Sequence, residues 1–176
     1  GADLPVLMDE VKNCGIGWVR VDFVWTWVEP SQDNFDWSIY DAIVAAANSR
    51  NIMIYCSVGN TPNWATDGTA GDGTDVPRSA ADFYDVCQRA AQRYDGNHGY
   101  GYIGYWGMWN EPNSNGFFKG TRQQYIDIIL KNGADAIHAG NPNAKVGGPE
   151  TDHIGSHDWS GWLTDCIAAA GAKLDI

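Results

Sequence analysis

The sequence predicts an α/β fold built from parallel β/α repeats, and three observations support this prediction. Strand-like segments alternate with segments of helical periodicity along nearly the whole chain. Strands that are separated by helices pair in parallel, with right-handed crossovers. No Gly-x-Gly-x-x-Gly or phosphate-loop motif follows any strand, which disfavours a nucleotide-binding fold. We therefore expect a (β/α) barrel, the TIM-barrel architecture, in a single domain over residues 1–176.

The first half of the chain contains two expected strands, each preceded by an expected helix. Apolar residues recur at helical spacing over 4–13, and a second helix is expected over 37–49 with Asp36 as its cap. Residues 18–25 alternate with a period of two, whereas 51–58 is a continuous apolar run, typical of a strand covered on both faces. The alternation places two sets of side chains on opposite faces of the first strand: Val19, Val21 and Phe23 on one, Trp18, Arg20 and Asp22 on the other.

The second half repeats this order with a longer loop. Residues 61–77 are rich in Gly and Asp and form a loop whose length is typical of functional or mobile segments. A helix capped by Ser79 is expected to run to Tyr94, and an aromatic strand is expected over 100–109. The remaining expected elements are a helix over 121–139, a short strand over 144–148 and a helix over 159–170.

The expected strands are too few for a complete barrel. Four are complete and Leu174–Ile176 resembles the opening of another. A barrel needs eight strands and typically ~250 residues. An incomplete barrel leaves parallel strand edges unpaired, and such edges associate with other chains. We therefore expect self-association or a complementing half-barrel as a partner.

The composition restricts the possible partners. The formal net charge is −11, which argues against nucleic acid and anionic membrane surfaces as partners. No apolar run reaches the length of a membrane span. No signal-peptide pattern opens the chain. We expect an extracellular location. Nine Trp and eight Tyr exceed what a core of this size needs, and such side chains suit stacking on sugar rings.

The four cysteines do not indicate a cofactor. Cys14, Cys56, Cys87 and Cys166 are far apart and form no Cys-x-x-Cys pair, so zinc or redox use is unsupported. Each lies in an apolar context, which favours buried free thiols, with one disulfide left open. We expect neither a cofactor nor a metal.

The segment from Trp106 to Asn113 is the most informative part of the chain. A buried aromatic strand ends there on Asn110-Glu111, and ligands bind at the carboxyl ends of parallel strands. Pro112 should restrict Glu111 to extended geometry and so stiffen the backbone that carries the carboxyl group. The alternative is an ordinary solvated turn, since Asn, Glu and Pro are common turn residues.

Five segments in order resemble the retaining glycoside hydrolases of clan A, most closely family 39 and family 5-like members. The resemblance implies a (β/α)8 barrel in which Asn110-Glu111 ends the fourth strand. On that alignment the chain runs from helix one through strand five to the start of strand six. The matching segments are Trp18-Val-Arg-Val-Asp-Phe, Val28-Glu-Pro with Phe35-Asp-Trp, Gly59-Asn-Thr-Pro-Asn-Trp-Ala, Trp109-Asn-Glu-Pro-Asn and Val146-Gly-Gly-Pro-Glu.

The resemblance also implies roles for single residues. Glu111 would be the general acid/base, which protonates the glycosidic oxygen and then deprotonates the attacking water. Burial among Trp106, Trp109 and a facing carboxylate would raise the pKa of Glu111. Asn110 would bind the sugar 2-hydroxyl, and Arg20 would support the nucleophile from inside the barrel.

The nucleophile has no counterpart here. The family places it as a second Glu at the end of strand seven, a strand that this chain lacks, and retention needs two carboxyls ~5 Å apart. Glu150 ends strand five, where we expect it to have a substrate-contact, structural or catalytic role. Glu29 precedes Pro30 and is expected in a loop or at the entry to a helix. If two copies of the half-barrel paired about a twofold axis, the position of the nucleophile would fall on Val58-Gly59-Asn60 of the second copy. That segment offers no carboxylate. Arg20 would then face no carboxylate.

Further residues are candidates for sugar or metal contacts. Trp25, Trp27 and Trp64 are either sugar platforms or core residues, and Trp109 and His153 are candidate substrate contacts. Glu150, His153 and His157 have a zinc-like spacing, but Gly155 and Ser156 interrupt any helix, which favours metal-free loop histidines. Asp67, Asp72 and Asp75 match no EF-hand, which favours a solvated acidic loop over calcium.

The function expected from these residues is hydrolysis of a β-linked oligo- or polysaccharide by a retaining mechanism, or a fragment of such an enzyme. The first alternative is a catalytically incomplete carbohydrate-binding or scaffold protein, which the missing nucleophile supports. The second is an unrelated α/β enzyme in which Asn-Glu-Pro-Asn is coincidental. Five ordered segments disfavour that second alternative.

Overall fold

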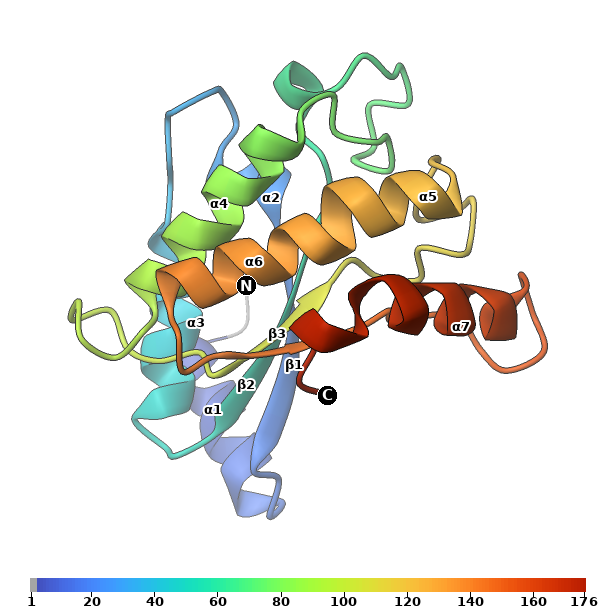
Figure 1. Ribbon diagram of the computed structural model, residues 1–176. Coiled ribbons are helices and arrows are strands. Elements are labelled where there is room, and N and C mark those ends of the chain that lie inside the picture. Colours follow the sequence, from blue (N-terminus) through green and yellow to red (C-terminus); the bar gives the residue numbers. More distant parts are fainter. Residues whose placement is uncertain (1–2) are drawn as a thin grey trace.

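The computed structural model describes residues 3–176 and contains one parallel sheet with strand order β1-β2-β3-β4 (Figure 1). This order confirms the expected α/β class with parallel repeats. Each strand pairs with the next along the chain, as the right-handed β/α repeat requires. The strands are β1 (Trp18–Val24), β2 (Met53–Gly59), β3 (Tyr105–Met108) and β4 (Lys145–Gly147).

Helices cover one face of this sheet, which we call the outer face. Its side chains include Phe23, Cys56 and Trp106, all fully buried, and α4 and α6 lie across it (Figure 1). None of the helices over residues 3–176 has the length and apolar character needed to cross a membrane. The main helices are α1 (Leu4–Asn13), α2 (Trp25–Val28), α3 (Ser38–Asn48), α4 (Ala80–Arg93), α6 (Lys131–Gly140) and α7 (Trp159–Ala170). Shorter turns are η1 (Asn63–Ala65), α5 (Arg122–Gln124), η2 (Tyr125–Leu130) and η3 (Gly171–Lys173).

Local sequence explains where the covering helices begin and how closely they pack. The Ser79 hydroxyl accepts backbone N–H bonds at the start of α4, as predicted. Thr121 and Gln124 form a capping box ahead of the continuous α5–η2–α6 helix. A Cβ at Gly140 would lie 2.3 Å from the Gln88 carbonyl oxygen, so only glycine lets α6 approach α4 this closely. Asp36 lies just outside α3 and accepts from the Ser38 N–H at 2.9 Å.

Three expected element boundaries are wrong. Residues 100–104 do not extend β3, because Gly99 and Gly101 have positive φ and turn the chain, which forms a bridge between Asp95 and Tyr102 instead. Trp25 starts α2 rather than ending β1. Residues 174–176 form no strand, although the backbone N–H of Asp175 donates to the Val146 carbonyl at 2.8 Å beside β4.

The cysteines follow the expectation with one exception. Cys56, Cys87 and Cys166 are buried free thiols. Cys14 is exposed, because it follows the end of α1 rather than lying under a helix.

Tyr40 joins α3 to the end of β1, which predicts a stability effect. Its hydroxyl accepts from the Val24 N–H at 2.7 Å and donates to the Asp22 carbonyl at 2.9 Å. Burial raises the pKa of Tyr40 to about 12, so the hydroxyl stays protonated. Because Tyr40→Phe leaves both backbone groups without this partner, we expect the free energy of unfolding to fall by about 1–3 kcal/mol in urea titrations.

Tyr84→Phe is the matched control for this change. Tyr84 is partly buried on α4, and its hydroxyl makes no hydrogen bond within residues 3–176. We expect this control to change the free energy of unfolding by less than about 0.5 kcal/mol. Equal effects of the two substitutions would contradict the assigned role of Tyr40.

Candidate active site

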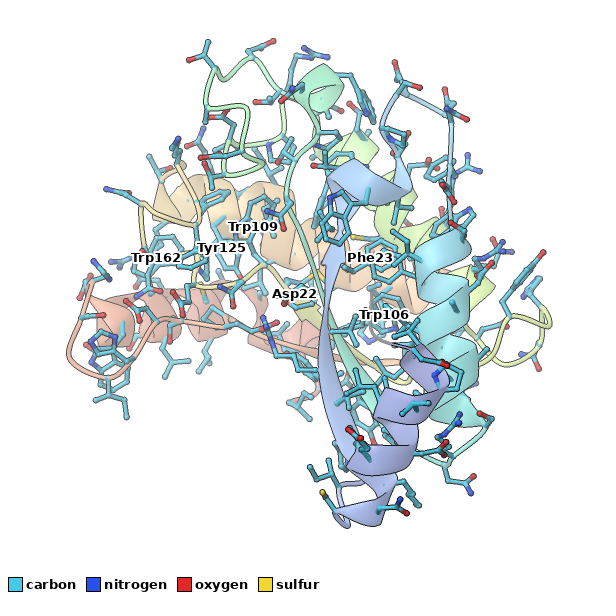
Figure 2. The ribbon with its side chains drawn as sticks, turned by 180° about the vertical axis from the view of Figure 1, so that it is seen from behind. Asp22, Phe23, Trp106, Trp109, Tyr125 and Trp162 are labelled. Carbon is cyan, nitrogen blue, oxygen red and sulfur yellow. The ribbon has the colours of Figure 1, made fainter. Side chains whose placement is uncertain are left out.

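The face of the sheet opposite the helices, which we call the inner face, carries the polar residues. Arg20 of β1 pairs in register with Tyr55 of β2, and Asp22 pairs with Ser57, which pairs with Gly107 of β3. Figure 2 shows Asp22 and Phe23 on opposite sides of β1, with Trp106 on the side of Phe23. The alternation predicted for residues 18–25 therefore holds for Arg20, which lies on the inner face.

The Glu150 carboxylate lies at the centre of this face. Its Oε1 accepts from the Ser57 hydroxyl at 2.8 Å and from the Tyr55 hydroxyl at 3.2 Å. Its Oε2 accepts from two nitrogens of Arg20, at 2.9 and 3.3 Å. Burial raises the pKa of Tyr55, and so does the nearby carboxylate, so Tyr55 stays a neutral donor. Both oxygens of Glu150 are thus held by the sheet.

Arg20 connects this carboxylate to the neighbouring groups. Its guanidinium also contacts the Asp22 carboxylate at 2.6 Å and donates to the Asn110 Oδ1 at 2.9 Å. Partial burial lowers the pKa of Arg20, but the Glu150 and Asp22 carboxylates outweigh this and raise it overall. The expectation that Arg20 would face no carboxylate is wrong, because Glu150 reaches back from the loop after β4.

Asn110 and Glu111 lie at the carboxyl end of β3, beside this network. Arg20 offers only donors, so the Asn110 side chain presents its oxygen to Arg20 and keeps its NH2 group for another partner. The Glu111 N–H donates to the Glu150 carbonyl at 2.9 Å, and the Ser114 N–H donates to the Glu111 carbonyl at 2.9 Å. Among the described residues, nothing forms a hydrogen bond or ion pair with the partly exposed Glu111 carboxyl group.

The backbone of Glu111 differs from its expected geometry. Its φ is 45°, in the left-handed region rather than the extended one. The two backbone hydrogen bonds to Glu150 and Ser114 hold Glu111 in a turn, which outweighs the preference for extended geometry before Pro112.

The tryptophans near the site belong mostly to the core. Trp106 is fully buried on the outer face and donates to the Ile103 carbonyl, so it does not flank Glu111. Trp109 is 2% exposed and donates to the Phe117 carbonyl (Figure 2). Trp25 is fully buried. The expectation that Trp25 and Trp109 are open to sugar is therefore wrong, because neither ring has an accessible face.

Trp64 and Glu29 tie together the loops that follow β1 and β2. Trp64 is partly buried, and its indole N–H donates to the Glu29 carbonyl at 2.8 Å. The Glu29 carboxyl is buried and accepts from the Trp25 indole at 2.7 Å and the Asp33 N–H at 2.8 Å. Burial raises the pKa of Glu29, against the effect of these bonds. Glu29 is thus a buried anchor of its loop.

The candidate metal ligands do not converge. His153 and His157 each contact Asp152 at 2.7 Å, whereas Glu150 points to Arg20. The His153 side chain is 76% exposed on this loop, so it stays accessible to a substrate. Over residues 3–176 no group of three His, Cys, Asp or Glu side chains is placed to hold a metal ion.

The three acidic residues of the 61–77 loop also have separate partners. Asp67 pairs with Arg78 at 2.9 Å. Asp72 accepts from the Thr74 hydroxyl at 2.6 Å, and Asp75 accepts from the Ala70 N–H at 2.8 Å. The carboxylates therefore organise the loop individually instead of forming one cluster.

Sequence reasoning missed Tyr55, Ser57 and Gly107. Residues 51–58 resemble a continuous apolar strand, and this hid the two hydroxyls that β2 presents to the inner face. Their period-two spacing was the available signal, because it puts them on the face of Arg20. Gly107 carries no chemistry of its own and is recognisable only from the space that Glu150 occupies above it.

Gly107→Ala tests the packing of this network. An added Cβ would lie 1.6 Å from the Glu150 Oε1 and 2.6 Å from the Tyr55 hydroxyl, so the carboxylate must leave its partners. We expect the free energy of unfolding to fall by about 1–3 kcal/mol, measured by urea titration. Gly17→Ala is the control, because its Cβ meets nothing within 4 Å, and an equal effect of both substitutions would contradict this packing.

Comparisons with known proteins identify relatives of this architecture. A family model for the glycosyl hydrolases family 39 matches residues 56–175, and one for beta-galactosidase matches residues 6–70. No curated protein matches the chain.

Solved structures share the fold. A GH39 enzyme from Xanthomonas axonopodis pv. citri is 23% identical with a TM-score of 0.71, over 98% of this chain and 36% of that chain. A GH39 beta-xylosidase from Caulobacter crescentus is 22% identical with a TM-score of 0.71, over 96% of this chain and 40% of that chain. An exo-beta-1,4-mannosidase from Opitutaceae bacterium strain TAV5 is 16% identical with a TM-score of 0.63, over 81% of this chain and 27% of that chain.

The solved structures and the family model support conclusions of different specificity. At such identities the structural likeness shows the fold alone, that of part of a (β/α) barrel, and the chain spans well under half the length of these three structures. The family model is more specific, because it covers more than half of the chain, including β3, β4 and the Asn110-Glu111 turn. The chain therefore belongs to the glycosyl hydrolases of family 39.

Proposed function

We propose that this chain carries the acid/base half of a retaining glycoside hydrolase that cleaves a β-linked oligo- or polysaccharide. The observation that carries the proposal is the contrast between Asn110 and Glu111 at the carboxyl end of β3. Asn110 is held by Arg20, whereas the Glu111 carboxyl group has no partner among the described residues. A carboxyl group left free beside a rigid polar network is suited to proton transfer.

Glu111 acts twice in this mechanism. Its carboxyl group first donates a proton to the glycosidic oxygen as the bond to the sugar breaks. The resulting carboxylate then removes a proton from the water that attacks the glycosyl-enzyme intermediate. The backbone bond from Glu111 to the Glu150 carbonyl holds the acid in place through both steps.

Asn110 binds the sugar beside the bond that breaks. Since Arg20 occupies its side-chain oxygen, the amide NH2 is available to donate to the 2-hydroxyl oxygen. A bond of this kind strengthens in the transition state and contributes to catalysis rather than only to affinity.

Glu150 positions this machinery in our proposal. Both of its oxygens are occupied by Arg20, Tyr55 and Ser57, which leaves it unsuited to attack on a sugar carbon. We place the nucleophile in a part of the enzyme that the longer relatives have and this chain does not span. In this proposal, Arg20 and Glu150 lie between Glu111 and the nucleophile and position both.

The open inner face supports a complementing partner. Trp18 and Met53 lie there in register at the amino end of β1 and β2, and they are 43% and 45% exposed. Such apolar side chains favour burial, so we propose that a complementing half-barrel or a second copy packs on them. We also propose an extracellular location, where polymeric β-linked substrates are accessible.

A carbohydrate-binding protein without catalysis is the second candidate. The other two carboxylates at the site favour this candidate. Glu150 and Asp22 both pair with Arg20, so neither is left free to act as a nucleophile. In that case Asn110 and Glu111 would contact sugar without turnover.

Glu111→Gln in the enzyme completed with its remaining barrel strands tests the proposal. Glutamine keeps the size of the side chain but cannot donate the proton, so we expect hydrolysis of unactivated β-linked oligosaccharides to fall by about 10²–10⁴-fold. The readout is the release of reducing sugar under conditions of substrate saturation.

Glu10→Gln serves as the control, because Glu10 is exposed on α1, away from the site. It should leave the rate unchanged. A Glu111→Gln variant with the parent rate would remove Glu111 from this role. Sugar binding without turnover in the parent would favour the second candidate.

A further inference from the structure

A hollow lies beyond the ends of β1 and β2, apart from the Asn110-Glu111 turn. Its volume is about 350 Å³, within the size range of small-molecule sites. Helix α2 and the 60–77 loop lie at the same end of the sheet (Figure 1), and Thr26 of α2 contacts Asn60. The residues around it that matter here are Thr26, Trp27, Asn60, Asn63, Asp72 and Gly73.

The walls of the hollow are held in place by hydrogen bonds. The Thr26 hydroxyl and N–H both donate to the Asn60 carbonyl, at 2.9 and 3.2 Å. The Thr61 N–H donates to the Gly73 carbonyl at 2.9 Å, which folds the 60–77 loop back on itself. Gly73 has a φ of 84° and lies against Asn60, so no side chain fills the space there. The hollow is therefore preorganised.

Trp27 gives the hollow an apolar wall. Its side chain is 58% exposed, whereas Trp25 and Val28 of the same short helix are fully buried. The helix thus uses two residues for the core and turns a large aromatic ring outward. An accessible Trp ring offers a flat apolar face of the kind that stacks on a sugar ring.

Asp72 and Asn63 give the hollow its polar side. The Asp72 Oδ1 is held by the N–H and hydroxyl of Thr74, and these bonds lower the pKa of Asp72. Its Oδ2 faces Lys119 Nζ at 3.6 Å. The Asp72 carboxylate can accept from sugar hydroxyls, and the Asn63 amide can both donate to them and accept from them.

The position of the hollow relates it to Glu111. Neighbouring strands are ~4.8 Å apart, so a group beyond β1 and β2 is one to two strand spacings from the end of β3. The Lys119 N–H donates to the Thr74 carbonyl at 2.9 Å, which joins the 60–77 loop to the segment after Glu111.

We propose that this hollow is a sugar subsite in which Trp27 stacks on one unit of the substrate while Asp72 and Asn63 bind its hydroxyls. The subsite rests on the proposed function and deepens it, because it selects β-linked chains that extend past the unit at Asn110. It predicts a preference for oligosaccharides over disaccharides.

Binding as a function of chain length tests the subsite. Isothermal titration with β-1,4-linked xylo-, cello- and manno-oligosaccharides of two to six units would be carried out on the Glu111→Gln enzyme, completed with its barrel, to prevent turnover. We expect at least one series to gain about tenfold in affinity between two units and the length that reaches the hollow, which corresponds to about 1.4 kcal/mol.

Variants of Trp27 separate stacking from other causes. Trp27→Ala should abolish the tenfold gain and leave disaccharide binding unchanged, and Trp27→Phe should keep most of the gain. Tyr100→Ala is the control, since Tyr100 is an aromatic residue 44% exposed in the loop before the amino end of β3. It should keep the whole gain.

The outcomes distinguish this proposal from the proposed function. A gain that survives in Trp27→Ala, or the absence of any oligosaccharide binding, overturns the subsite. A Trp27-dependent gain in a protein whose parent form has no Glu111-dependent hydrolysis would keep the subsite and reject the catalytic role.

Discussion

The ion pair between Arg20 and Glu150 is the constraint on which the site depends. It joins β1, at one edge of the sheet, to the loop after β4, at the other edge, and passes over β2 and β3. Charged groups on a partly buried face are stable only when they are paired and hydrogen-bonded. The Tyr55 and Ser57 hydroxyls complete the pairing, and Gly107 leaves the space that it needs.

The rest of the site follows from this pairing. Arg20, which is paired with the Glu150 carboxylate, orients the Asn110 amide. The Glu150 backbone carbonyl holds the turn at Glu111. Glu150 therefore supports Asn110 through Arg20 and Glu111 directly. The outer face, where α4 and α6 pack on apolar side chains, supplies a rigid base. Beyond the strand ends, the short helix α2 and the loop after β2 are joined by hydrogen bonds, and α2 exposes Trp27 there.

The features that could be predicted from the sequence are those that depend on the pattern of neighbouring residues. Alternation placed Arg20 on the face opposite Phe23, and the Ser79 cap marked the start of α4. The sequence could not predict what depends on distant packing. The partner of Arg20 is a residue far along the chain, and the burial of Trp25 and Trp109 depends on contacts with other elements. The turn at Glu111 was hidden because its hydrogen bond to Glu150 outweighs a local preference.

A double-mutant cycle on Arg20 and Glu150 tests the central claim most directly. The free energy of unfolding would be measured by urea titration for the parent, Arg20→Met, Glu150→Gln and the double variant. The described pairing predicts a coupling energy of about 1 kcal/mol or more, so that the double variant loses less than the sum of the single losses. Additive losses, within about 0.3 kcal/mol, would contradict the pairing and the site built on it.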